Sequence, residues 1–454
     1  MPFGARGVKR LAYARFAVKF AAPKQGSVMP QDFAKTVFNR VTRDAGASGG
    51  LDKDAQQAEP GNFLRHIAAL SGSKLADGLI DPKLVLSWLL THLGAGSFWV
   101  GLLVPVRESG ALLPQLFTTP YIAASPYRKW FWAGGSAVQG VCAGGIAVAG
   151  LTLQGAVAGA VIVTLLGVLA LARSVCSASY KDVLGKTVGK SRRGTATGFA
   201  SSAAAVGVIA FALVLLLDPG DRAVIVIAAL LLAAAVWLIA AAVMAGLKEP
   251  RSQPEDASGI GLRQFRLLRT DPQLLRFIAV RSLLVGTALA PPYFLLLRPD
   301  SALNQLGALV LASATAALVS SYVWGRLSDQ SSRKVLMYAG IAGGAVLSAV
   351  VALTQIGWIT VPGVIPVALF GLMIAYQGVR IGRSTHLVDM ADEGDRAPYT
   401  ALSNTIVGLV LLVAGGLFAA VGAASVPLVI ALFAVMCWGA AGLAAGLKEV
   451  QADA

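Results

Sequence analysis

The sequence predicts an all-helical membrane protein that crosses the bilayer twelve times. Apolar residues make up 56% of its 454 residues and charged residues only 13%, against roughly 25% charged residues in an ordinary soluble domain. The apolar residues form long continuous runs, and in lipid only helices and closed barrels satisfy every backbone hydrogen bond. Because the runs lack the alternation of barrel strands, we expect helices. A soluble protein with a very large core does not explain repeated runs of this length.

Twelve apolar runs divide the chain into two halves. Each run is long enough to cross about 30 Å of hydrocarbon at about 1.5 Å per residue. The runs cover residues 70–93, 98–122, 130–150, 154–179, 194–217, 222–246, 274–297, 303–324, 334–355, 360–381, 399–421 and 425–446. The longest connection, residues 247–273, contains Pro250 and Pro254 and separates six runs from six. The sequence therefore predicts two six-helix bundles, residues 63–246 and 274–446, joined by this linker and followed by a tail at 447–454.

The positions of the basic residues predict the orientation in the membrane. The net charge is +15. Lys and Arg gather in connections on one side, with two, five, five, three and two of them in residues 123–129, 180–193, 247–273, 325–334 and 382–398. The opposite connections contain only Arg298, with Arg222 at the edge of a helix. This asymmetry predicts that both termini are cytoplasmic, and it indicates that the positive charge faces a lipid bilayer rather than nucleic acid.

Residues 1–62 differ from the rest of the chain. In residues 1–38 seven Lys and Arg stand against one acid, Asp32. No apolar core of 7–15 residues follows them, so this is not a secretory signal. We interpret the segment as a basic cytoplasmic arm that lies on anionic lipid, with residues 46–62 as a flexible linker.

A short charged stretch joins the eighth and ninth runs. It reads Gly-Arg-Leu-Ser-Asp-(x)3-Arg-Lys, with Gly325, Arg326, Asp329, Arg333 and Lys334 as its distinctive positions. This pattern resembles the signature loop of the major facilitator superfamily, a class of secondary transporters. The resemblance implies the twelve-helix major-facilitator fold, with two pseudo-symmetric six-helix bundles. It also implies that the Gly permits a tight turn, and that the Asp and the basic pair hold neighbouring helix ends together. Residues 180–187 resemble bacterial members, so we expect the inner (plasma) membrane.

The two halves repeat a few charged positions, as this fold implies. A shift of 205 residues places Arg333 and Lys334 on Arg128 and Lys129. The first half has Pro120 and Ala124 in place of the Gly and the Asp of the signature, so we expect a degraded latch there. A shift of 207 residues relates two pairs that we predict to form a cytoplasmic gate, namely Arg173 and Asp182 with Arg380 and Asp389.

Ionisable residues inside the membrane are costly, so they are candidates for function. Asp77 and Asp81 lie four residues apart and would share one helix face, with a kink at the following Pro82. The second run contains Arg107 and Glu108, and the seventh contains Arg281. The resemblance implies that the first, fourth, seventh and tenth helices line the cavity and that a membrane carboxylate carries protons. The predicted proton and substrate residues are Asp77, Asp81, Arg107, Glu108 and Arg281.

Structural roles remain open for the same residues. Asp77 and Asp81 can instead lie at the cytoplasmic interface and pair with Lys74 and Lys83. Arg107 and Glu108 are adjacent and point in different directions, so one of them can pair with another helix purely for stability. Arg173 and Arg380 lie near enough to the surface to extend their charges into it.

The function most consistent with these patterns is secondary active transport of a small solute by alternating access. An excess of Arg in the later helices favours an anionic or zwitterionic solute, and the membrane carboxylates favour coupling to protons. The alternative is a permease subunit energised by a separate ATPase partner. We expect no enzyme activity, cofactor or metal, because the three His (His66, His92, His386) and three Cys (Cys142, Cys176, Cys437) have no ligand spacing.

Overall fold

Helices form wherever the apolar runs occur. The computed structural model describes residues 31–42, 51–217, 221–252, 265–391 and 396–451. Nine helices within these ranges are long and apolar enough to span a membrane, and the longest such stretch, Asn304–Gln355, covers 52 residues. Many apolar side chains on the helices are exposed, such as Val141 and Leu151, as expected where a helix faces lipid tails rather than water.

The first half begins with a short helix, α1 (Gln31–Thr42), outside the bundle. Its bundle consists of α2 (Lys53–Leu79), α3 (Val85–His92), α4 (Ser97–Leu112), α5 (Gln115–Ala123), α6 (Lys129–Thr152), α7 (Gly155–Thr187), α8 (Arg193–Leu217) and α9 (Arg222–Ala245). Here α6 packs between α7 and α9, and α2 packs against α8 and α9. The first two predicted runs are each broken in two, into α2 and α3 and into α4 and α5.

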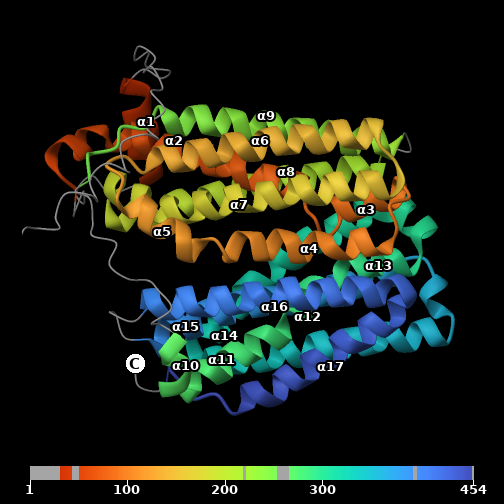
Figure 1. Cartoon of the computed structure of the whole chain (residues 1–454). Coiled ribbons are helices and arrows are strands. Elements are labelled where there is room, and N and C mark those ends of the chain that lie inside the picture. The colour runs from red at the N-terminus through yellow and green to blue at the C-terminus, as the bar shows by residue number, and fades with distance from the viewer. Residues whose placement is uncertain (1–30, 43–50, 218–220, 253–264, 392–395, 452–454) are drawn as a thin grey trace, which may run out of the picture.

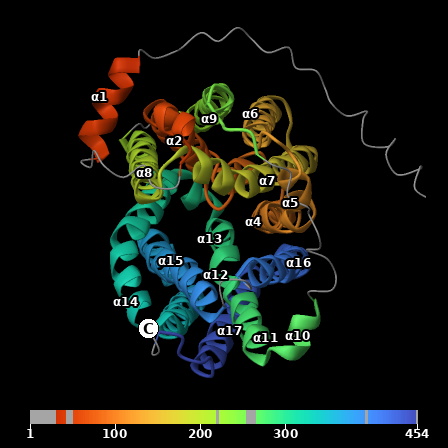
Figure 2. The ribbon, with the colours of Figure 1, turned by 90° about the vertical axis from the view of Figure 1, so that its left-hand side faces the viewer.

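The second half starts with α10 (Leu267–Thr270), which lies in the predicted linker. The broken seventh run follows as α11 (Pro272–Leu284), α12 (Gly286–Leu289) and α13 (Pro291–Leu297). It continues through α14 (Pro299–Gln355), α15 (Val364–Met390), α16 (Arg396–Ala424) and α17 (Val426–Ala445). Figure 1 shows the two halves as separate layers of near-parallel helices, and Figure 2 shows them end-on. They meet where α4 packs against α16 and where α8 packs against α14.

The signature stretch is more helical than a loop. α14 contains both the eighth and the ninth predicted runs, and its only non-helical residue is Ser331, with φ −165° and ψ 98°. A Cβ added at Gly378 of α15 would meet both Trp324 and Ala339, so the two parts of α14 fold back side by side. The expected tight loop of ten residues is therefore a single break at Ser331.

Two other expectations about local structure are wrong. Residues 53–62, which we expect to be linker, form the first turns of α2, because Glu59 at 1% exposure pairs with Arg192 at 2.9 Å and anchors them. Asp77 and Asp81 do not share a helix face, because α2 ends at Leu79. Pro82 lacks a backbone N–H, and the chain breaks around it before α3 begins.

Candidate functional site

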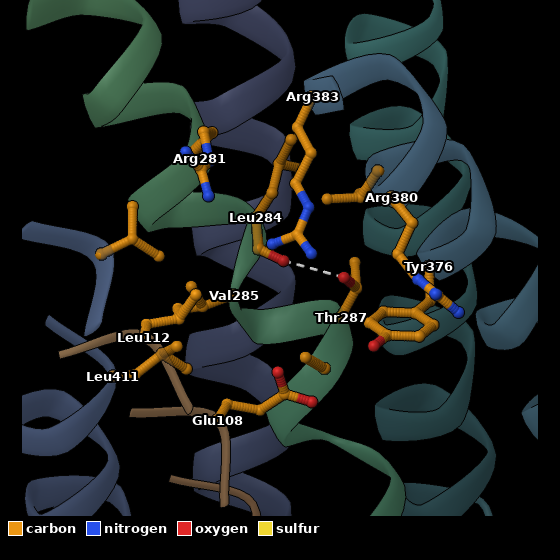
Figure 3. A pocket seen from close by; sticks show the side chains of 13 residues that line it. Glu108, Leu112, Arg281, Leu284, Val285, Thr287, Tyr376, Arg380, Arg383 and Leu411 are labelled. Atoms are coloured by element: carbon orange, nitrogen blue, oxygen red, sulfur yellow. Dashed lines mark hydrogen bonds between the residues drawn. The ribbon is translucent and has the colours of Figure 1, made fainter. Parts of the chain in front are cut away.

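A small cavity lies where the two halves meet (Figure 3). Glu108 and Leu112 of α4 line it from the first half, and residues of α11, α12, α15 and α16 line it from the second half. Its volume is about 40 Å³, room for a few water molecules at about 10–15 Å³ each. A drug-sized solute needs about 300–1,000 Å³, so a solute can occupy this place only if the two halves move apart.

Three arginines surround this cavity. Figure 3 shows Arg281, Arg380 and Arg383 around one space, with Glu108 on the opposite side. Arg281 is only 5% exposed. It donates hydrogen bonds to the Ser403 hydroxyl and, at 3.2 Å, to Asn404 Oδ1, while its Nε has no hydrogen-bond partner among the described residues. Among the described residues, none of the three arginines forms an ion pair with an acid, so the cavity is strongly positive.

Lys83, which is not among the predicted site residues, reaches the same region. It lies in the break between α2 and α3, and its side chain is buried. Its ammonium lies 3.6 Å from the centre of the Tyr376 ring of α15 and 4.0 Å from Glu108 Oε1. A cation over an aromatic face is attracted by the ring quadrupole. Lys83 therefore links the first half to the second across the cavity.

Asp77 is fixed inside the first half. Its Oδ1 accepts a hydrogen bond from Arg107 Nη2 at 2.8 Å, and its Oδ2 pairs with Arg173 Nη2 at 2.6 Å. Arg173 also donates to the Ser73 hydroxyl at 2.9 Å. Lys74 is within electrostatic range of Asp77, but the ion pairs of Asp77 are those with Arg107 and Arg173. Arg107 and Glu108 do point in different directions, the first to Asp77 and the second to the cavity.

Asp81 borders a second cavity of about 130 Å³. Most of the lining is apolar and comes from the end of α2, the break before α3, α8 and α14, with Ser313 as the other polar side chain. The Asp81 carboxylate accepts a hydrogen bond from the backbone N–H of Lys83, at 3.0 Å. Asp81 thus lies in a small, mostly apolar chamber. Among the described residues, no cation lies within ion-pair distance (4.0 Å) of its carboxylate.

The four predicted gate residues do not form one group. Arg173 and Arg380 lie in the central charged region, whereas Asp182 and Asp389 lie near the ends of their helices. Asp182 pairs with Arg128 Nη1 at 2.6 Å and with Lys186. Asp389 accepts a hydrogen bond from Gln451 at 2.6 Å. In this conformation the four side chains lie in separate places and do not contact one another.

The first half joins its helix ends through a residue outside the signature pattern, whose Gly and Asp positions hold Pro120 and Ala124. Glu249, just after α9, accepts the backbone N–H groups of Arg128 and Lys129 at 3.0 and 2.9 Å. A carboxylate there satisfies free donors at the start of α6 and suits the positive end of the helix dipole. The Lys129 ammonium in turn donates to the carbonyls of Ala245 and Leu247.

The second half repeats this arrangement with Glu449. Its carboxylate accepts a hydrogen bond from the Ser331 hydroxyl at 2.6 Å and lies 3.4 Å from Arg333 Nε. Arg333 also donates to the Ala445 carbonyl at 3.2 Å, as Lys129 does to Ala245. Both glutamates end the sequence Gly-Leu-Lys-Glu, at residues 246–249 and 446–449. This repeat is visible in the sequence, and a search at a shift of 200 residues would have found it.

The remaining signature residues lie at the surface. Asp329 and Arg326 are exposed, and the Arg326 guanidinium lies 5.0 Å from the ring centre of Tyr322. Asp329 has no ion pair with any residue that the structure describes. Nothing lies within 4 Å of a Cβ added at Gly325, so close helix contact does not require a glycine there. Lys334 is exposed, and its backbone N–H donates to Ser331 Oγ at 3.1 Å, so Ser331 caps the second part of α14.

Metal ligation finds no support in the described ranges, where no three His, Cys, Asp or Glu side chains cluster. His66 and His386 are buried and contact the hydroxyls of Thr187 and Ser332, at 2.7 and 2.9 Å.

Comparison with known proteins agrees with this architecture. The family model described as Major Facilitator Superfamily matches residues 72–410. Solved structures of similar fold include a point mutant of the nucleoside transporter NupG, with a TM-score of 0.65, 14% identity, and coverage of 85% of this chain and 100% of that one. They also include the inward-open xylose transporter XylE from E. coli (TM-score 0.63, 9% identity, 86% and 98% covered) and a D-xylose-proton symporter (TM-score 0.62, 12% identity, 86% and 98% covered).

No curated protein matches the sequence, and identities of this size establish a shared fold alone. The family match, however, covers well over half of the chain. The chain therefore belongs to the major facilitator superfamily of membrane transporters and has its all-helical, multi-pass fold.

Proposed function

We propose that the protein is a secondary active transporter that moves a small anionic or zwitterionic solute by alternating access. The observation that carries this proposal is the charged cavity at the junction of the two halves, lined by Glu108 from one half and three arginines from the other. A site between two bundles is exposed to one side of the membrane or the other as the bundles rock. The small size of the cavity fits a conformation in which the bundles have closed on the site.

The two latch networks support rigid-body movement of each half. Arg128, Asp182 and Glu249 join helix ends of the first half to one another. Arg333 and Glu449 do the same in the second half. None of these contacts crosses between the halves, so each bundle moves as one unit. The basic connections on one side support cytoplasmic termini and a location in the bacterial inner (plasma) membrane.

Uptake of radiolabelled solutes into proteoliposomes tests the proposal. Purified full-length protein without any ATP or ATPase should accumulate at least one anionic or zwitterionic solute above protein-free liposomes. Uptake that requires ATP and a co-purifying ATPase would instead make the chain a permease subunit. Glu108→Ala should slow solute uptake, and Asp54→Ala, which removes an exposed carboxylate at the start of α2, should not.

Coupling to protons is the finer part of the proposal, with Asp81 as the proton carrier. Asp77 is paired with two arginines, and Glu108 lies beside Lys83 and faces the positive cavity, so both carboxylates already have cationic neighbours. Asp81 has a backbone N–H as its hydrogen-bond donor and a chamber large enough for water. The charged groups that face it are Lys83, Glu108 and Arg107.

A pH gradient distinguishes this role from a structural one. Wild-type proteoliposomes should take up solute faster when the outside is acidic, and a proton ionophore should remove the effect. Asp81→Asn should abolish the response to the gradient and keep solute exchange at equal pH on both sides. Uptake by the wild type that ignores the gradient would remove proton coupling and leave the transporter proposal standing.

A further inference from the structure

Four cations inside the membrane are related by the pseudo-symmetry of the fold. A shift of 207 residues relates Arg173 of α7 to Arg380 of α15, and the same shift relates Lys74 of α2 to Arg281 of α11. In each half one member is on the first membrane helix and the other on the fourth. The first helix of each half is also broken beyond its cation, around Pro82 and before Pro291. The two halves therefore resemble each other both in the positions of these cations and in the break of the first helix.

These cations lie close to one another rather than at separate places. Lys74 is within electrostatic range of Arg173 and of Arg380, although Arg380 belongs to the other half. Arg281 is within range of Arg383. Arg281, Arg380 and Arg383 line one cavity. Like charges gathered at membrane depth repel one another and lose hydration, so such a cluster persists only where it has a function.

The acids in this region do not balance the cations. The described cations of the region are Lys74, Lys83, Arg107, Arg173, Arg281, Arg380 and Arg383, and the described acids are Asp77, Asp81 and Glu108. Asp77 is already shared between Arg107 and Arg173, and Glu108 lies beside Lys83. None of Arg281, Arg380 and Arg383 forms an ion pair within 4.0 Å among the described residues, and Arg380 and Arg383 share the single carboxylate of Glu108 at longer range with Lys83. The site is therefore short of negative charge.

We propose that a doubly charged phosphate group of an organic solute supplies this negative charge, bound by Arg281, Arg380 and Arg383 with Lys74 and Arg173 nearby. The inference rests on the proposed transport function and names its substrate class. Guanidinium groups bind oxyanions through two parallel hydrogen bonds. The three arginines surround a single space. They therefore suit a phosphate group, which has two charges in one place, better than a dicarboxylate, whose charges lie apart.

The rest of the cavity suits the organic part of such a solute. Leu112, Val285 and Leu411 form an apolar side, and the Tyr376 ring borders the arginines. Glu108 lies opposite the arginines and would repel a second anionic group at the far end of the solute. The cavity thus favours a monophosphate ester over a bisphosphate.

Ligand-induced thermal stabilisation of the purified full-length protein tests the proposal. The probes are glucose 6-phosphate, glycerol 3-phosphate, inorganic phosphate, glucose, glycerol and succinate. A ligand that binds the folded state raises its melting temperature with concentration. At least one phosphate ester should bind ten-fold or more tightly than its parent alcohol and than succinate. Inorganic phosphate should bind more weakly than that ester, because it lacks the organic part.

Variants locate the effect in the arginine cluster. Arg281→Gln and Arg380→Gln should each weaken binding of the phosphate ester ten-fold or more, and Arg281→Lys should restore part of it. Lys53→Gln, which removes an exposed cation at the start of α2, should leave binding unchanged. Melting temperatures without ligand show whether each variant is folded; if Arg281→Gln is not, the Arg380→Gln result decides.

The outcomes separate this inference from the proposed function. If glucose, glycerol or succinate binds as tightly as the phosphate esters, or if the arginine variants bind the ester like the wild type, the phosphate site is refuted. Transport of a neutral solute at an unchanged rate by Arg380→Gln would likewise refute it while the protein remains a transporter. Phosphate esters that bind through these arginines but are never carried into proteoliposomes would support the binding site and refute the esters as the transported solute.

Discussion

Substitution of Gly415 tests how the two halves fit together. Gly415 lies on α16, and a Cβ added there would be 2.2 Å from Cγ and 2.4 Å from Cβ of Pro105 on α4. Carbon atoms in contact are normally about 3.5–4.0 Å apart. Pro105 is a rigid ring inside a helix, so it cannot rotate away. Gly415→Ala therefore pushes α4 and α16 apart by roughly 1 Å or more.

The expected cost follows from this overlap. Forcing an extra carbon into a packed interface costs about 1–3 kcal/mol, and each 1.4 kcal/mol is about a ten-fold change in an equilibrium. Because α4 and α16 belong to different halves, the cost falls on the conformation in which this interface is closed. We expect Gly415→Ala to reduce the population of that conformation by about 5- to 150-fold and to slow solute uptake.

The neighbouring glycine provides a matched control. A Cβ at Gly416 would meet nothing within 4 Å, and both substitutions gain the same helix propensity of about 1 kcal/mol. Melting temperature and proteoliposome uptake should therefore be unchanged or higher for Gly416→Ala and lower for Gly415→Ala. Equal melting temperatures and uptake rates for the two variants would refute this account of the interface.

Three further substitutions test the charged contacts. Asp77→Asn leaves two partly buried arginines without their shared carboxylate, so it should destabilise the protein by about 1–3 kcal/mol. A melting temperature equal to the wild type would contradict this. Glu449→Gln should slow transport more than Asp329→Asn, since Glu449 contacts Arg333 and Asp329 is exposed. If Asp329→Asn slows uptake more, Asp329 and not Glu449 holds the helix ends together. Glu59→Gln, which weakens a buried ion pair, should increase protease cleavage before α2, and an unchanged digestion pattern would argue against that anchor.

The sequence was sufficient for the architecture and the family. Long apolar runs predict helices because lipid offers the backbone no other partner, and each predicted run coincides with helical structure. The Gly-Arg-Leu-Ser-Asp pattern identified the superfamily that the family model confirms. Charges in the membrane were also visible as candidates, and Glu108 and Arg281 do line the central cavity. These features depend on composition and local order, which a single sequence contains.

The tertiary structure alone decided which charges meet. Nothing near Lys83 in the sequence indicates that it lies over Tyr376, which is nearly three hundred residues away. Arg383 was counted as a loop residue, yet it lines the cavity beside Arg281. The roles of Asp77 and Asp81 separated only because a helix ends between them. The physical reason is that helix ends and helix contacts set the distances between charges, and in a medium that screens poorly those distances determine which charges pair and which remain available for a ligand.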